Sequence, residues 1–86
     1  MKYLVTCICH GDSCNGHATK IGNVNTLTEA EAVIKDDMRL FASGIEGCIR
    51  EYDEISNDDF TIKFSKRNAE IWYDSNNGRV YDIHEN

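Results

Sequence analysis

The chain has 86 residues, of which 41% are hydrophobic and 28% are charged, and it contains no proline. These values exclude a disordered or low-complexity chain and leave room for one modest core, so we expect a single domain over residues 1–86. The formal net charge is −6, from fifteen acidic and nine basic side chains. That balance disfavours direct nucleic-acid binding, which needs a basic face.

Residues 2–9 are rich in β-branched and aromatic types, which predicts a first strand. Alternation places Tyr3, Val5, Cys7 and Cys9 on one face of it. The apolar run is too short for a signal sequence or a membrane-spanning helix. We therefore expect a cytoplasmic protein without a membrane segment, in which cysteines stay reduced.

Three of the four cysteines and two of the three histidines fall within residues 7–17. We expect a long loop over residues 10–25, in which residues 20–24 could add a short strand. Thiolate and imidazole groups suit tetrahedral zinc, and the expected ligands are Cys9, Cys14, His17 and His10, with Cys7 or Cys48 as substitutes. The competing interpretation makes Cys7 and Cys9 small core residues beside a polar loop, so the cofactor is zinc or none.

A principal helix is expected over about residues 27–43. Thr26 and Glu29 form a capping box at its start, and Ser43-Gly44 is a credible stop. Apolar residues recur at spacings of three and four, as in a helix laid on a sheet: Leu27, Ala30, Val33, Ile34, Met38 and Phe41. Helical spacing continues beyond the stop, so a second short helix is expected over residues 45–53.

The acidic segment, residues 46–59, contains six acidic side chains against Arg50 alone. Its acidic members are Glu46, Glu51, Asp53, Glu54, Asp58 and Asp59. Most charge runs are solvated surface, but this concentration favours a protein partner with a basic surface.

The C-terminal third predicts three strands, at residues 59–64, 69–74 and 79–84. With a three-residue second turn that ends in a left-handed Gly78, both hairpins give one apolar face. That face consists of Phe60, Ile62, Phe64, Ala69, Ile71, Tyr73, Tyr81 and Ile83. The predicted architecture is thus α+β, in the order β-α-(α)-β-β-β, with a mainly antiparallel four-stranded sheet and the helix on one face.

The predicted register opposes Ile62 to Ile71 and Phe60 to Tyr73 in the first hairpin. In the second hairpin it opposes Ile71 to Ile83 and Tyr73 to Tyr81. Trp72 then points to the other face of the sheet, with Thr61 and Asp82 across from it. A tryptophan on a solvent face is a candidate partner anchor, although a covered tryptophan is an equal alternative.

Catalytic motifs are weak. Cys14 with His17 or His10 lacks an orienting third group, and the glycines of residues 11–16 lack the lysine of a phosphate loop. We therefore expect a non-enzymatic protein-binding module, an inhibitor of a basic nucleic-acid-handling protein. Phages and other mobile elements often encode inhibitors of this size and acidity. The alternative is a small zinc-binding domain that uses the Cys/His loop, residues 7–17.

Overall fold

The computed structural model describes residues 2–11, 14, 16–43 and 60–86. One helix, α1, spans Leu27–Ser43 within these residues, where sequence predicted it. The strands are β1 (Tyr3–His10), β2 (Ala18–Val24), β3 (Thr61–Phe64), β4 (Asn68–Trp72) and β5 (Gly78–Glu85). The α+β prediction is confirmed. The expected second helix over residues 45–53 lies outside the described residues.

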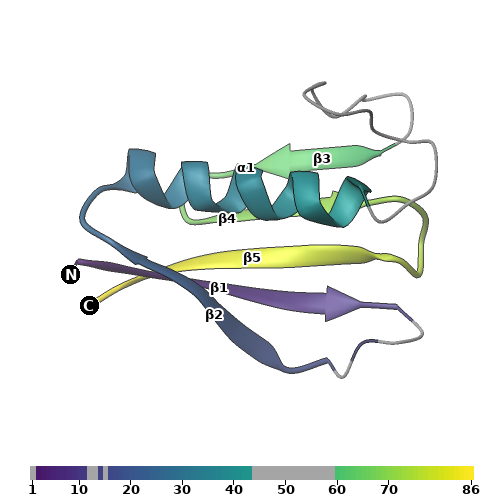
Figure 1. The fold of residues 1–86 in the computed structure, drawn as a ribbon, viewed down its shortest axis with the longest axis horizontal. Helices are drawn as coiled ribbons and strands as arrows, with labels where there is room; N and C mark the ends of the chain where they lie inside the picture. The colour runs from purple at the N-terminus through teal and green to yellow at the C-terminus, as the bar shows by residue number, and fades with distance from the viewer. Residues whose placement is uncertain (1, 12–13, 15, 44–59) are drawn as a thin grey trace.

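The strands form one antiparallel sheet in the order β2-β1-β5-β4-β3 (Figure 1). The expected count of four strands was wrong, because residues 18–24 form a full strand inside the segment predicted as a loop. β2 lies at the edge of the sheet and Ala18, Thr19 and Lys20 are exposed, so it lacks the alternation of a half-buried strand. Its pairing with β1 also shifts register between Val5 and Thr6.

β1 lies between β2 and β5, a position that the sequence left open. Its pairing with β5 joins the two ends of the chain, which lie side by side in Figure 1. The backbone N–H of Asn86 donates to the carbonyl oxygen of Lys2 at 2.9 Å. As predicted, Val5 and Cys7 point to the core face of β1 and are buried.

The core lies between α1 and one face of the sheet. Helix residues Ala30, Ile34, Met38 and Ala42 are buried against Val5, Cys7, Phe60, Ala69, Ile71, Tyr81 and Ile83. α1 comes closest to β1, β2 and β5. Phe64 and Tyr73 of the predicted apolar face are therefore left 42% and 45% exposed.

The first hairpin has the predicted register, with Ile62 opposite Ile71 and Phe64 opposite Ala69. The predicted register of the second hairpin was wrong, because Ile71 pairs with Arg79 and Trp72 with Gly78. Residues 73–77 form a longer turn than expected, and Gly78 is not left-handed.

The wrong register does not change which side chains lie on each face of the sheet. The observed pairing differs from the expected one by an even number of residues, and side chains alternate with a period of two. Trp72 therefore lies on the predicted face, opposite the face that receives the helix.

Candidate functional site

The sheet face that does not receive α1 is called the open face here. Within the described part of the chain, no helix packs on it. Strand pairing brings together on this face Leu4, Thr6, Ile8, His10, Thr61, Lys63, Asn68, Glu70, Trp72, Val80, Asp82 and His84. Trp72 is only half-buried there, as are Leu4, Ile8 and Val80. The open face therefore presents an apolar strip flanked by polar side chains.

Trp72 lies across the end of the sheet, between Thr61 of β3 and Gly78 of β5. A Cβ atom added at Gly78 would lie 2.4 Å from Cε3 of Trp72 and 2.5 Å from the carbonyl oxygen of Ile71. The indole therefore packs directly on the β5 backbone, where only glycine leaves room. The His10 and Trp72 rings lie 5.3 Å apart between centroids at a tilt of 35°. Packing and ring contact thus hold the indole in one orientation.

A shallow hollow of about 440 Å³ adjoins Trp72, lined by Thr61, Lys63, Glu70, Trp72, Tyr73, Asp74 and Ser75. Lys63 of β3 and Glu70 of β4 pair opposite one another and both line it, with Nζ and Oε1 3.9 Å apart. Both are partly in water, so this ion pair adds little stability. It leaves an ammonium and a carboxylate beside an aromatic ring, a combination suited to a polar partner surface.

The rim of this hollow is shaped by Asp74. Its Oδ1 accepts hydrogen bonds from the backbone N–H groups of Asn76 and Asn77, each at 2.8 Å. The hydrogen bond from Asn76 and those from Asn77 lower the pKa of the Asp74 carboxyl. These bonds organise residues 73–77 as a side-chain-supported turn, which explains why the sequence-based three-residue turn was wrong.

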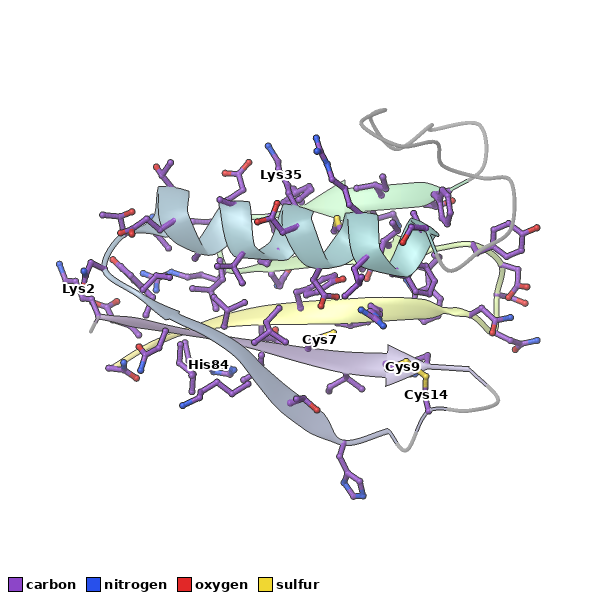
Figure 2. The ribbon with its side chains drawn as sticks, viewed as in Figure 1. Lys2, Cys7, Cys9, Cys14, Lys35 and His84 are labelled. Carbon is purple, nitrogen blue, oxygen red and sulfur yellow. A yellow bond between two sulfur atoms is a disulfide. The ribbon has the colours of Figure 1, made fainter. Side chains whose placement is uncertain are left out.

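The Cys/His loop is joined by a disulfide between Cys9 and Cys14 (Figure 2). The backbone N–H of Cys14 also donates to the carbonyl oxygen of Gly11 at 3.2 Å. Two of the expected zinc ligands are thus bonded to each other, and His10 contacts Trp72. Among described residues, His, Cys, Asp and Glu side chains nowhere gather in a metal-binding group of three. His17, at the end of the loop, is exposed.

A polar network under the helix was not predicted from the sequence. Oδ1 of Asp37 accepts hydrogen bonds from Nη1 of Arg79 at 2.6 Å and from the Tyr81 hydroxyl at 2.7 Å. Sγ of Cys7 lies 4.0 Å from the same oxygen. The strand pattern could have predicted this network, because Arg79 lies two residues before Tyr81 and four before Ile83. Arg79 therefore shares the core face of β5 with them. An inward arginine requires a carboxylate partner.

The network keeps Cys7 protonated. Burial, followed by the charge of Asp37, raises the pKa of the Cys7 thiol to about 11. Because the thiolate is the nucleophilic form, Cys7 is chemically inert near neutral pH. It serves the core, as the sequence-based alternative expected.

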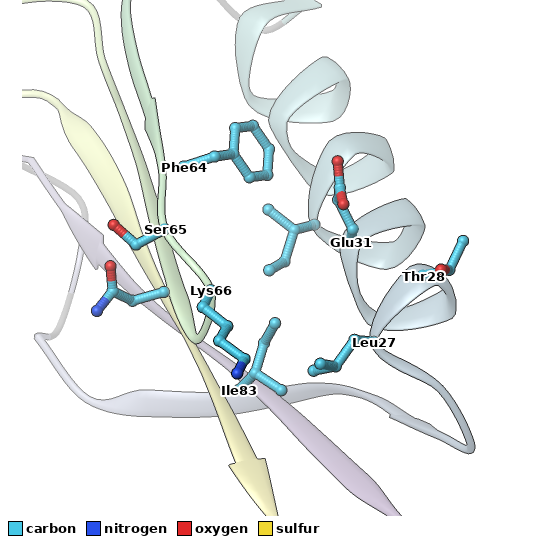
Figure 3. Close-up of a pocket in the computed structure, with 9 residues that line it drawn as sticks. Leu27, Thr28, Glu31, Phe64, Ser65, Lys66 and Ile83 are labelled. Atoms are coloured by element: carbon cyan, nitrogen blue, oxygen red, sulfur yellow. The ribbon is translucent and has the colours of Figure 1, made fainter.

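A second hollow of about 380 Å³ lies between α1 and the β3–β4 turn (Figure 3). Leu27, Ile34, Phe64 and Ile83 form its apolar walls, with Glu31 and Lys66 also lining it. Nζ of Lys35 lies 5.8 Å from the Phe64 ring centroid and 3.0 Å from Oε1 of Glu31. Sequence reasoning missed this hollow because it assumed that the helix covers Phe64.

The predicted partner-binding residues divide between the described and undescribed parts of the chain. Trp72 is described and lies on the open face. The remaining six lie outside the described residues: Glu46, Glu51, Asp53, Glu54, Asp58 and Asp59.

Comparison of the chain with protein-family models, curated proteins and solved structures finds no match. In the described part of the chain, no helix has the length and apolar character needed to cross a membrane.

Proposed function

We propose that the chain is a non-enzymatic protein-binding module that inhibits a basic nucleic-acid-handling protein. The observation that carries the proposal is the position of Trp72, half-buried on the open face and fixed by Gly78 and His10. An aromatic side chain that is already ordered loses little conformational entropy on binding, and tryptophan is enriched among residues that dominate interface energies.

The charge distribution supports the same proposal. Of the fifteen acidic and nine basic side chains in the sequence, seven acids and one base fall outside the described residues. The described part of the chain therefore has eight of each sign and is neutral overall. The net charge of the protein resides in Asp12 and the acidic segment, which is the arrangement expected when a charged segment recruits a partner and a neutral fold supports it.

Inhibition follows from the chemistry of the acidic segment. Its carboxylates would occupy positions on a basic partner where nucleic-acid phosphates otherwise bind. Such contacts mainly raise the association rate and weaken as salt screens them. Trp72 would supply the apolar contact that slows dissociation.

The test is capture of basic proteins from a lysate of the source by the purified full chain. Reversing Asp53, Glu54, Asp58 and Asp59 to lysine changes the charge of the acidic segment. We expect the reversed protein to lose capture of basic nucleic-acid-handling proteins and to keep its melting temperature. Capture of the same proteins by both forms would contradict the proposal.

A matched control reverses acidic residues of the neutral described part. Glu31 and Asp36 are exposed on α1 and take no part in its cap, so their reversal changes the net charge without altering the acidic segment. We expect Glu31→Lys with Asp36→Lys to keep the capture that Asp58→Lys with Asp59→Lys, a reversal of the same charge, loses. If the two sets of variants lose capture equally, net charge is responsible and the acidic segment is not a specific site.

A zinc-binding domain is the second candidate function. Its support is the proximity of Cys9 and Cys14, two predicted ligands that the fold brings into direct contact. After reduction, their thiolates and the imidazoles of His10 and His17 would form the predicted ligand set. Metal analysis of protein purified under reducing conditions without chelator tests this function. Stoichiometric zinc, with a melting temperature lowered by EDTA, is the expected result; substoichiometric zinc with unchanged melting contradicts it.

A further inference from the structure

The disulfide between Cys9 and Cys14 lies at the same end of the sheet as Trp72, and its sulfurs differ from that of Cys7 in accessibility. Cys9 and Cys14 are both partly exposed, whereas Cys7 is buried and only 7% exposed. Thiol–disulfide exchange requires that an external thiolate reach a sulfur atom. Of the cysteines that the structure describes, Cys9 and Cys14 are therefore the pair open to exchange.

Two contacts connect this disulfide to Trp72 and to the turn that follows it. Cys9 and His10 are consecutive in β1, and the His10 ring contacts the indole of Trp72. Gly11 forms the second link. A Cβ atom added there would lie 3.7 Å from Sγ of Cys14 and 2.9 Å from Oδ1 of Asn77. Asn77 belongs to the turn that joins Trp72 to Gly78. The disulfide thus lies next to His10, which contacts the indole, and next to Gly11, which approaches the turn that follows Trp72.

We infer that Cys9 and Cys14 form a redox-active pair whose oxidation state sets the position of His10 and the exposure of Trp72. In the oxidised form the disulfide reinforces the end of β1, where pairing of His10 with Gly78 places the imidazole against the indole. An external thiol such as glutathione reduces it in two exchanges: a first thiolate attacks one sulfur and forms a mixed disulfide, and a second thiolate attacks the reductant sulfur of that bond and releases the protein thiol. The protein gains two electrons and two protons as two thiols, and the reductant leaves as a disulfide.

Reduction removes the bond between Cys9 and Cys14, loosens the end of β1 at His10 and so weakens the ring contact on the indole. If Trp72 binds the partner, as the proposed function holds, reduction also changes capture. The redox chemistry itself is independent of that function, so the two ideas can be tested separately.

The experiment uses the full chain with Cys48→Ser, which prevents exchange with that cysteine, and follows Trp72, the only tryptophan in the sequence. The protein is equilibrated in glutathione buffers set to the redox potential (the poise) of the cytosol or of an oxidising compartment. Its free thiols are then counted by alkylation and mass spectrometry. We expect two additional thiols at the cytosolic poise and their loss when the protein is returned to the oxidising poise. Trp72 emission should shift to the red, and its quenching by acrylamide should increase, while the circular-dichroism spectrum stays folded.

Three variants identify the cause of the signal. Cys9→Ser with Cys14→Ser should show the red-shifted Trp72 emission of the dithiol form under every redox condition. His10→Gln should keep the thiol titration and lose most of the emission change. Cys7→Ala should behave like the parent protein, because Cys7 is not in the disulfide.

Three results would overturn the inference: a disulfide that persists at the cytosolic poise, thiols that stay free at the oxidising poise, or full reduction without a change in Trp72 emission. Partner capture is measured on the same samples. Loss of capture in every redox state would refute the proposed function and leave the redox result standing.

Discussion

At the scale of single residues, Asp37 connects the helix to the sheet. Its Oδ1 accepts hydrogen bonds from both Arg79 and Tyr81, and the Arg79 guanidinium also lies 5.4 Å from the Phe41 ring centroid. Asp37 and Arg79 are mostly buried, with side chains 17% and 24% exposed. Removing one member therefore leaves the others without a partner in a place that water reaches poorly.

Asp37→Ala should lower the free energy of unfolding by about 3 kcal/mol, because it leaves a mostly buried guanidinium and hydroxyl unpaired. Asp36→Ala is the matched control, since Asp36 is exposed on the same helix turn. It should change stability by less than about 0.5 kcal/mol. Urea unfolding of both variants measures the difference. Equal effects would show that the network contributes nothing specific.

The same network predicts how stability depends on pH. Burial and then Asp37 raise the pKa of Cys7 from 9.0 to about 11, and burial and then the hydrogen bond to Asp37 raise that of Tyr81. The folded state therefore holds protons that the unfolded state releases above pH 9, and stability is lost as pH rises from 9 to 11 and beyond. The melting temperature of Cys7→Ala should fall less steeply over this interval than that of the parent protein. Parallel curves would contradict the assigned cause.

At the scale of elements, the sequence predicted what local signals determine. The bounds of α1 were predicted from a cap, a stop and a repeating apolar pattern. The cap is present, since the backbone N–H of Glu29 donates to Oγ1 of Thr26 at 3.1 Å. β2 was incompletely predicted because an exposed edge strand has no apolar periodicity. The β4–β5 register was wrong because Asp74 stabilises a longer turn by hydrogen bonds that turn statistics do not contain.

The candidate site was predicted only in part: the sequence indicated the sheet face of Trp72 but not its contacts. Alternation placed Trp72 on the open face, because successive side chains of a strand point to opposite faces of the sheet whatever the register. Its contacts with His10 and Gly78 were not predictable, because they require the long-range pairing of β1 with β5 and the true register of β4 with β5. The Cys9–Cys14 disulfide was missed because the sequence-based argument assumed reduced cysteines.

Thr26→Ala tests the cap. It removes the hydroxyl that accepts from the Glu29 N–H and should lower the free energy of unfolding by about 1 kcal/mol. Thr28→Ala in the first turn of α1 is the control, because the side-chain hydrogen bonds of the cap use the hydroxyl of Thr26. Thermal unfolding by circular dichroism compares the two. A larger loss for Thr28→Ala would mean that the helix start is stabilised differently.

At the scale of the whole molecule, a neutral fold carries an acidic segment in its sequence. The central strands β1 and β5 hold both chain ends together, and α1 covers one face of the sheet. The opposite face offers Trp72, with the partly exposed Cys9–Cys14 disulfide at the same end of the sheet. We propose that this face and the acidic segment together bind a basic protein.

Site-specific photocrosslinking can show whether the partner contacts Trp72. A photoreactive phenylalanine analogue replaces Trp72 in one protein and Leu40 in another. Leu40 is the matched control, because it is 66% exposed but lies on α1, away from the open face. In a lysate of the source, the analogue at position 72 should crosslink to a basic protein. Reversal of Asp53, Glu54, Asp58 and Asp59 should abolish that product, and position 40 should give none. Crosslinking at position 40 alone, or products at position 72 that persist after the reversal, would contradict binding of a basic protein at this face.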